Sequence, residues 1–259
     1  MVEFFFEKFG KVVTDFLEFL GGLGRLSAKT FKDMFHSPQY IQLTLNQIQS
    51  IGNESLPLVV VTCLSTGMVI ALQFAYGLEK FGGQLYVPKV IALSFIRELG
   101  PVFTSLMVCA RVGAGIAAEV GSMNVTEQID AIRALGTSPI KKIVIPRISA
   151  TLIALPILTV FGILIGLIGG MIICYTELNL TPQFYYNKIT ETIILKDFFA
   201  GMGKTFFFAI IISMIGCYKG LTTKGGTQGV GISTTQSVVL GTISILIADF
   251  FLTKLFMEL

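Results

Sequence analysis

Two adjacent charged residues, Arg97 and Glu98, interrupt a long apolar segment of this sequence. A charge near the middle of a lipid-facing helix costs about 2.5–3.5 kcal/mol on insertion scales, so such side chains normally face a bundle interior or a wet cavity. Neighbouring residues of a helix point about 100° apart, which prevents an ideal ion pair between these two. Either they line a pocket in which Arg97 binds an anionic head group, or they form an internal ion-pair network that only holds helices together.

Three further charged residues lie in or beside apolar segments and could be buried functional charges: Arg111, Glu119 and Asp249. Arg111 follows Arg97 by nearly four helical turns, so we expect it at the inner membrane interface, directed towards Glu119 in a structural role. For Asp249, both the substrate-binding and the structural interpretations stay open.

The sequence pattern contains no obvious residues for metal, nucleotide or catalytic chemistry. The single histidine, His36, has no cysteine or second histidine nearby, and each of the four cysteines stands alone in an apolar segment. Residues 201–205 resemble the end of a phosphate-binding loop, but Phe198 occupies the position where that motif needs its first glycine. We therefore expect no metal, no bound cofactor and no catalytic site in this chain.

A block of charged residues in the middle of the chain surrounds a predicted short helix at about residues 122–136. Three of them recur at every third position along this helix: Glu127, Asp130 and Arg133. Gly136 is typical of a helix C-terminus, and we expect Pro139 to prevent the helix from resuming. A short charged helix between two apolar segments predicts a docking site for a soluble protein.

The composition is that of a polytopic membrane protein. The 259 residues are 53% hydrophobic and 14% charged, whereas soluble domains carry about 25% charged residues. The mean hydropathy is +0.78. The formal net charge of +3 is small and indicates no nucleic-acid partner. We expect an all-α integral membrane protein in which residues 1–259 form a single transmembrane domain.

Runs of about 20 apolar residues predict five transmembrane helices. Their approximate ranges are 55–78, 90–118, 148–175, 198–218 and 228–252. Residues 1–36 predict an amphipathic helix in the membrane interface, broken at Gly21, Gly22 and Gly24. Residues 38–54 predict an elbow helix that leads into the first span.

The distribution of Lys and Arg predicts the orientation, because basic residues concentrate in cytoplasmic segments. Eleven lie on the side of the N-terminus and the central block: Lys8, Lys11, Arg25, Lys29, Lys32, Arg133, Lys141, Lys142, Arg147, Lys219 and Lys224. Five lie on the other side: Lys80, Lys89, Lys188, Lys196 and Lys254. We therefore expect the N-terminus and the central block inside, and the C-terminus outside.

Several short motifs, in their order and spacing, resemble those of the MlaE family of ABC-transporter permeases. They are Arg97-Glu-Leu-Gly-Pro101, Ala110-Arg-Val-Gly-Ala-Gly115, Ala118-Glu-Val-Gly121, Thr126-Glu-Gln128, Pro146-Arg147 and Gly229-Val-Gly-Ile-Ser233. Each is weak alone and the set is specific, and the similarity covers nearly the whole chain. Members of this family are associated with MCE proteins and move phospholipids between bacterial membranes, and chloroplast relatives exist.

The resemblance implies a homodimeric permease in the bacterial inner membrane, or in the chloroplast inner envelope if the chain is plastid-encoded. It also implies an ABC ATPase that uses the ATP, an MCE-domain periplasmic protein that receives phospholipid, and possible binding of a small accessory subunit to the ATPase. The family's lipid-pocket residues correspond to Arg97 and Glu98. The ATPase-coupling residues are expected to be Glu127, Asp130, Arg133, Leu135, Gly136 and Pro139. The segment 130–133 varies within the family, so its ATPase partner could be matched to this chain.

Two other functions fit parts of the sequence. The segment from Glu127 to Gly136 also resembles the ATPase-contact loop of solute-importer permeases, which work with a soluble binding protein. In that case the motif from Arg97 to Pro101 has no explanation. A membrane scaffold without transport activity would leave both the charges in the apolar segments and the docking helix without a role.

Overall fold

The computed structural model describes residues 2–34 and 40–258, and no β-strand occurs among them. The helices are α1 Val2–Met34, α2 Ile41–Glu79, η1 Gln84–Tyr86, α3 Val87–Ser94, η2 Phe95–Leu99, α4 Gly100–Val108, η3 Cys109–Gly113, α5 Ala114–Val125, α6 Gln128–Ala134, η4 Ile140–Val144, α7 Ile145–Thr176, α8 Pro182–Thr192, α9 Leu195–Leu221 and α10 Gly226–Glu258. This confirms the all-α fold. Residues 35–39, which hold the predicted end of the interfacial region, the start of the elbow helix and His36, lie outside the described residues.

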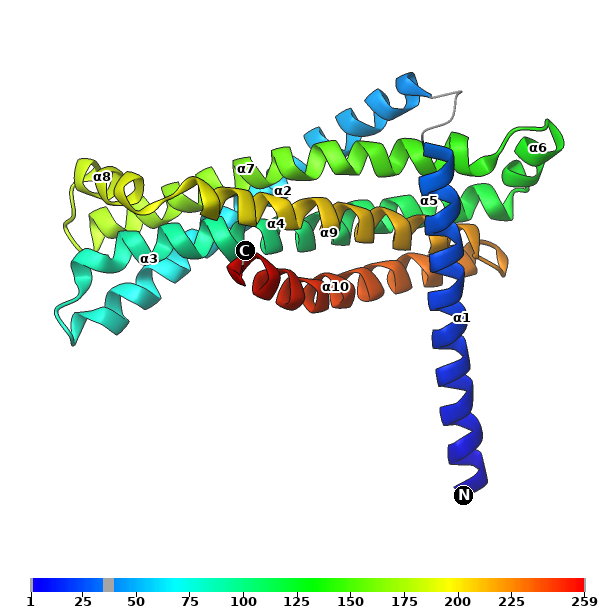
Figure 1. The fold of residues 1–259 in the computed structure, drawn as a ribbon, viewed down its shortest axis with the longest axis horizontal. Coiled ribbons are helices and arrows are strands. Elements are labelled where there is room, and N and C mark those ends of the chain that lie inside the picture. Colours follow the sequence, from blue (N-terminus) through cyan, green and yellow to red (C-terminus); the bar gives the residue numbers. More distant parts are fainter. Residues whose placement is uncertain (1, 35–39, 259) are drawn as a thin grey trace.

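Five helical stretches are long and apolar enough to cross a membrane, as the sequence predicted. They are Ile41–Glu79, Gln84–Val125, Ile140–Thr176, Leu195–Leu221 and Gly226–Phe256. These stretches lie along one another in an elongated bundle, with α6 at one end and α8 at the other (Figure 1). We call these the α6 end and the α8 end. The chain is a multi-pass membrane protein.

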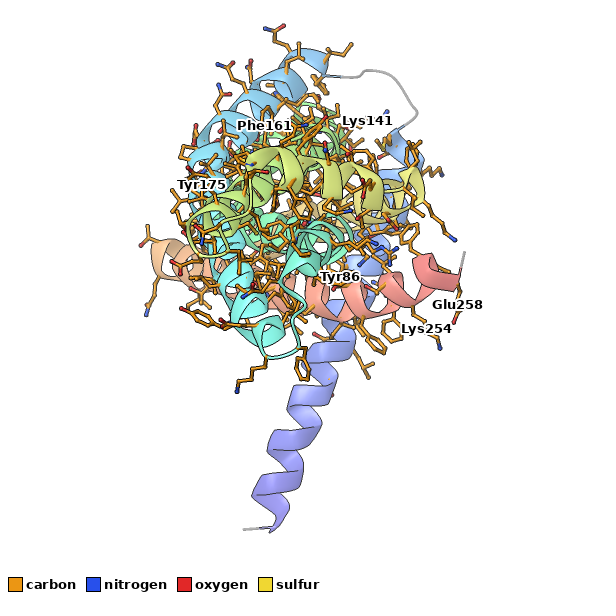
Figure 2. The ribbon with its side chains drawn as sticks, turned by 90° about the vertical axis from the view of Figure 1, so that its left-hand side faces the viewer. Tyr86, Lys141, Phe161, Tyr175, Lys254 and Glu258 are labelled. Atoms are coloured by element: carbon orange, nitrogen blue, oxygen red, sulfur yellow. The ribbon has the colours of Figure 1, made fainter. Side chains whose placement is uncertain are left out.

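Helix α1 runs across the spans rather than along them, and it extends well beyond the outline of the bundle (Figures 1 and 2). The prediction that Gly21, Gly22 and Gly24 break this helix is wrong, because α1 continues through all three. A glycine inside a helix costs only about 1 kcal/mol. At Gly22 the absence of a side chain also permits a close contact between α1 and α9, because a Cβ atom there would lie 2.2 Å from the hydroxyl of Tyr218 in α9.

The prediction of a separate elbow helix is also wrong. Helix α2 runs without interruption from Ile41 to Glu79 and includes Pro57. The change from polar to apolar residues near position 55 therefore marks a change of surroundings and not a helix end. Intrahelical hydrogen bonds are local, so a helix can leave the membrane without stopping.

The second span contains two π-helical segments, and each carries an arginine: η2 with Arg97 and η3 with Arg111. Pro101 follows η2 and has no N–H group to offer to the preceding turn. In η2, the Gly100 N–H bonds the carbonyl of Phe95, five residues earlier. Such widened turns are rare and occur frequently at functional sites.

Glycines at every fourth position, Gly162, Gly166 and Gly170, let α7 pack closely against its neighbours. A Cβ atom at Gly166 would lie 2.0 Å from the Phe95 ring. One at Gly67 in α2 would lie 2.1 Å from the backbone oxygen of Gly166. The backbones of α2 and α7 therefore meet at Gly67 and Gly166 with no side chain between them. The contact of Phe95 with Gly166 places η2 against α7.

Tyrosines mark the α8 end of the bundle. Four of them are more than half exposed there: Tyr76, Tyr86, Tyr175 and Tyr186, and two are labelled in Figure 2. Tyrosine is enriched at membrane–water interfaces, where its ring and hydroxyl meet different surroundings. Helix α8, which the sequence did not predict, is anchored by the buried Tyr185, whose hydroxyl donates to the Leu167 carbonyl at 2.9 Å. Burial raises the pKa of Tyr185, so its hydroxyl keeps the proton it donates.

Candidate functional site

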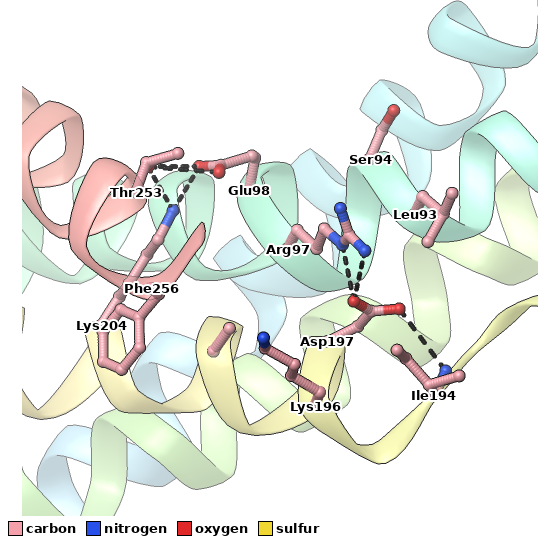
Figure 3. Close-up of a pocket in the computed structure, with 11 residues that line it drawn as sticks. Leu93, Ser94, Arg97, Glu98, Ile194, Lys196, Asp197, Lys204, Thr253 and Phe256 are labelled. Carbon is pink, nitrogen blue, oxygen red and sulfur yellow. Dashed lines mark hydrogen bonds and ion pairs between the residues drawn. The ribbon is translucent and has the colours of Figure 1, made fainter. Parts of the chain in front are cut away.

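A cavity of about 500 Å³ lies towards the α8 end, where α3 and η2 face the start of α9 and the end of α10 (Figure 3). Its charged lining residues are Arg97, Glu98, Lys196, Asp197 and Lys204. Its apolar lining residues are Leu93, Ile194, Ala200 and Phe256. Ligand sites commonly combine an apolar wall with a few polar groups in this way.

Arg97 forms an ion pair with Asp197. Its Nε donates to Asp197 Oδ1 at 2.8 Å, and Nη2 lies 2.5 Å from the same oxygen. The other carboxylate oxygen accepts the Ile194 N–H at 3.5 Å, which caps the first turn of α9. The Asp197 side chain is 5% exposed and that of Arg97 is 41% exposed. Arg97 Nη1 has no hydrogen bond to a described residue. Nε and Nη2 therefore fix the guanidinium on Asp197, and Nη1 is available to a ligand in the cavity.

Glu98 belongs to a second network, centred on Lys204. The Lys204 ammonium donates to Glu98 Oε2 at 2.5 Å, to Thr253 Oγ1 at 2.6 Å and to Asp249 Oδ1 at 3.1 Å. The Thr253 hydroxyl lies 3.2 Å from Glu98 Oε1, to which it can donate. Lys204 is 1% exposed, whereas 37% of the Glu98 side chain is exposed. This network joins the second, fourth and fifth spans and leaves the Glu98 carboxylate open to the cavity.

Arg97 and Glu98 thus line one cavity but pair with different residues, as their adjacency in the chain predicted. Asp249, for which two interpretations stayed open, lies in the Lys204 network with 21% of its side chain exposed. The binding of a substrate by Arg97 and Glu98 stays a prediction.

The sequence interpretation missed Lys204 and Asp197 as site residues. Lys204 could have been found as an isolated charge inside the fourth apolar segment, by the argument used for Arg97. Its place in a sequence that resembles a phosphate-binding loop hid this signal. Residues 201–205 lie inside α9, and a Cβ atom at Gly201 would lie 2.1 Å from the Ile96 carbonyl oxygen. Gly201 therefore brings α9 against η2, which allows Lys204 to reach Glu98.

The predicted contact between Arg111 and Glu119 is wrong. Arg111 Nη2 pairs with Glu54 in α2, and Nη1 donates to the Ser55 hydroxyl at 2.9 Å. Glu119 pairs instead with Arg147 Nη2 at 2.8 Å. Arg111 and Glu119 lie eight residues apart on one helical stretch, so their side chains point about 80° apart and lie about 12 Å apart along the axis. Residues of neighbouring helices are closer.

The predicted helix over residues 122–136 is in fact two helices. Helix α5 ends at Val125, and Glu127, in the left-handed conformation with φ 59°, precedes α6. Ile129 and Ile132 are buried, whereas Asp130 and Arg133 form an exposed ion pair at 2.8 Å. A chain reversal at Glu127 lets α6 fold back with its isoleucines on the bundle and its charges outward.

The end of α6 confirms one prediction and corrects another. Gly136 has φ +73°, and the N–H groups of Gly136 and Thr137 bond the carbonyls of Arg133 and Ile132. This is the Schellman arrangement that ends many helices. Pro139 does not prevent a new helix. It precedes η4 directly, so the third span begins near residue 140 rather than 148. A proline needs no hydrogen-bond acceptor at the start of a helix and is favoured there.

Among the described residues, no group of three or more His, Cys, Asp or Glu side chains could hold a metal ion. The four cysteines are free and buried.

Comparison with known proteins identifies the family. The model of the permease MlaE matches residues 44–255. The chain belongs to the MlaE family of permeases. This MlaE-family permease is 38% identical over 249 residues to a probable ABC transporter permease protein of Rickettsia conorii, with 96% of each chain covered. It is 40% identical over 215 residues to a probable ABC transporter permease protein of the cyanobacterium Synechocystis, which covers 83% of this chain and 82% of the relative.

A plant relative is also similar to this permease. The chloroplastic protein TRIGALACTOSYLDIACYLGLYCEROL 1 of Arabidopsis thaliana is 36% identical over 215 residues, which cover 83% of this chain and 61% of the plant protein. The family match spans α6 and every cavity residue except Phe256, whereas α1 lies before it. As an ABC transporter permease, the protein requires an ATPase partner.

Proposed function

We propose that this permease moves phospholipid between the inner membrane and a periplasmic MCE protein, and that the cavity beside Arg97 receives the lipid head group. The observation that carries this proposal is a cavity within the span region in which two half-exposed charges are held by buried partners. Arg97 is fixed by Asp197 and Glu98 by Lys204, so both charges are already oriented before a ligand arrives. Such preorganisation lowers the cost of binding.

The chemistry of the cavity suits a phospholipid. Lys196 is exposed and makes no ion pair with a described residue, and Arg97 Nη1 lacks a hydrogen bond. Together they offer positive charge to a phosphate. Glu98 can accept from an amine or hydroxyl of the head group, and Leu93 and Phe256 provide apolar surface for the glycerol and acyl portions. The Arabidopsis relative is named for trigalactosyldiacylglycerol, which is a glycerolipid.

Removing positive charge from the cavity should lower the amount of bound phospholipid. A charge-assisted hydrogen bond contributes about 1.5–3 kcal/mol, so we expect Arg97→Gln and Lys196→Gln each to reduce phospholipid per folded protein about tenfold. The measurement is lipid phosphorus and thermal stability on the same purified preparations. Lys89→Gln, which removes an exposed lysine of α3 that does not line the cavity, is the matched control and should bind normally.

The two charge changes also separate substrate binding from a structural role. Arg97→Gln leaves the buried Asp197 without its partner and should lower stability, whereas Lys196→Gln breaks no ion pair to a described residue. If phospholipid per folded protein stays at the control level in both variants, the cavity is not the head-group site.

The α6 end is proposed to face the cytoplasm, with the N-terminus inside and the C-terminus outside. The excess of basic residues on the side of α1 and α6 supports this orientation. In a cysteine-free background, a thiol reagent that cannot cross the membrane should label a cysteine at Asn187 in intact cells and not one at Ser138. Labelling at Ser138 alone would reverse the orientation.

The proposed assembly is a homodimer in the bacterial inner membrane, or in the chloroplast inner envelope for a plastid chain. Two copies of the ATPase bind at α6 and hydrolyse the ATP, so the permease itself has no ATPase site and no cofactor. The MCE protein binds on the side of α8, and a small accessory subunit could attach to the ATPase. The exposed charges of α6, together with Leu135, whose exposed fraction is 81%, support the ATPase contact.

A further inference from the structure

A second cavity, of about 640 Å³, lies at the α6 end, whereas the cavity beside Arg97 lies towards the α8 end. One wall is the C-terminal half of α1, and the facing wall is the segment that joins α6 to α7, together with the end of α9. Its basic lining residues are Arg25, Lys29, Lys32 and Arg133, and its one carboxylate is Asp33. We call it the basic cleft.

Helix α1 presents the basic residues of the cleft as a row. Arg25, Lys29 and Lys32 follow the spacing i, i+4 and i+7, which places them on one side of a helix. The adjacent positions, Leu26 and Thr30, are 9% and 3% exposed, so they attach the helix to the bundle. The burial of this neighbouring row holds the basic side chains along the edge of the cleft.

Aromatic contacts hold α1 in this place. The Phe19 ring meets the Tyr218 ring edge-on at a centroid distance of 5.4 Å, and the Lys219 ammonium lies 5.0 Å from the centre of Phe19. The absence of a side chain at Gly22 lets Tyr218 contact the helix backbone. The wall of the cleft is therefore a packed element of the protein.

The charges of the cleft favour an anion. Arg133 already pairs with Asp130, so its charge is largely offset. On the α1 wall, Arg25, Lys29 and Lys32 stand against the single carboxylate of Asp33, which is a formal excess of two positive charges. Hydroxyl groups of Ser138 and Tyr218 add hydrogen-bonding capacity beside apolar surface from Ile140 and Leu221. A volume of this size lies in the range of small-molecule sites and exceeds what an inorganic ion needs.

The exposed residues of α1 indicate that the anion is attached to a lipid. Leu17, Leu20 and Phe31 are 61%, 46% and 52% exposed on the same helix that carries the basic row. A helix with exposed apolar and basic residues, running across the spans, is typical of the membrane interface. Acyl chains would then lie beside α1 and phosphate groups at the level of its basic row.

We propose that the basic cleft binds the head group of an anionic phospholipid of the cytoplasmic leaflet, as a resident lipid that holds α1 against the bundle. The proposal uses the orientation given under Proposed function, but it does not depend on which substrate the permease moves. The two cavities lie at opposite ends of the bundle, so this lipid is distinct from the transported one.

The test uses the full-length permease in phosphatidylcholine nanodiscs with increasing mole fractions of a photoreactive phosphatidylglycerol that carries its reactive group near the phosphate. Cross-links should map to residues 22–33 and 133–140. A basic residue at an anionic surface contributes about fivefold in affinity, so Arg25→Gln/Lys29→Gln should raise the half-saturating mole fraction roughly 25-fold, beyond the accessible range. The control Lys80→Gln/Lys89→Gln removes two exposed charges at the α8 end and should label normally.

Four results would overturn the proposal. The first is labelling of the cleft that is unchanged in Arg25→Gln/Lys29→Gln, and the second is equal labelling by a photoreactive phosphatidylcholine. The third is displacement of the lipid by soluble glycerophosphate, which would indicate a site for a free anion. The fourth is loss of labelling when the ATPase binds, with cross-links from α1 to an acidic segment of that partner. If the wild-type permease shows normal cleft labelling but moves no phospholipid, the proposed function is contradicted and this proposal stands.

Discussion

Replacing Lys204 with methionine should destabilise this MlaE-family permease by about 3–5 kcal/mol, the cost of removing one partner from a buried ion pair. Methionine fills a similar volume, so the loss is one of charge and hydrogen bonding. Without the ammonium, the Glu98 and Asp249 carboxylates would face each other with no cation among their described contacts. Thermal unfolding of the purified protein, followed by fluorescence or by loss of the folded peak in gel filtration, measures the change.

Lys196→Met is the matched control, because Lys196 lines the same cavity but is exposed and unpaired with any described residue. Its stability should equal that of the wild type. Adding Glu98→Gln to Lys204→Met removes one of the two stranded carboxylates and should restore part of the loss. If Lys204→Met and Lys196→Met unfold alike, the network does not stabilise the bundle, and the carboxylates must carry protons.

Reversing the charge of Asp130 should reduce co-purification of the ATPase about tenfold or more, because α6 is the proposed docking element and hot-spot residues contribute 2 kcal/mol or more to an interface. Asp130→Lys breaks only an exposed ion pair with Arg133, so the permease itself should lose less than about 1 kcal/mol of stability. The measurements are the ratio of ATPase to permease after purification and the ATP-dependent transport of phospholipid.

An ion pair at the α8 end of the bundle provides a close control. Lys188 and Glu191 in α8 form an ion pair with the same i, i+3 spacing and the same 2.8 Å distance as Asp130 and Arg133. Glu191→Lys should therefore disturb α8 as much as Asp130→Lys disturbs α6, and leave ATPase binding unchanged. A loss of ATPase with Glu191→Lys, and not with Asp130→Lys, would move the docking site to the α8 end and reverse the proposed orientation.

The sequence alone predicted the parts of this protein that depend on local chemistry. Long apolar runs predicted the five spans, because the thickness of the bilayer sets the length of a helix that crosses it. Gly136 predicted a helix end, because few other residues adopt a positive φ at low cost. The charges at Arg97 and Glu98 predicted a cavity or a network, because a membrane does not tolerate them facing lipid.

Helix limits were predicted less well, because the polarity of a segment does not decide where a helix ends. The polar residues before position 55 belong to the same helix as the first span, and the glycines of α1 lie in a continuous helix. In α1, the contact between Gly22 and Tyr218 joins residues nearly 200 positions apart, and no local pattern contains that information.

Only the tertiary structure decided which charges pair. Arg97 meets Asp197 across 100 positions, and Glu98 meets Lys204 across 106. Arg111 forms an ion pair with Glu54, and Glu119 forms one with Arg147. Each choice depends on how neighbouring helices are rotated and how closely they approach. These are set by packing between helices, such as the close approach of Gly201 to the Ile96 carbonyl, and not by the spacing of charges along one helix.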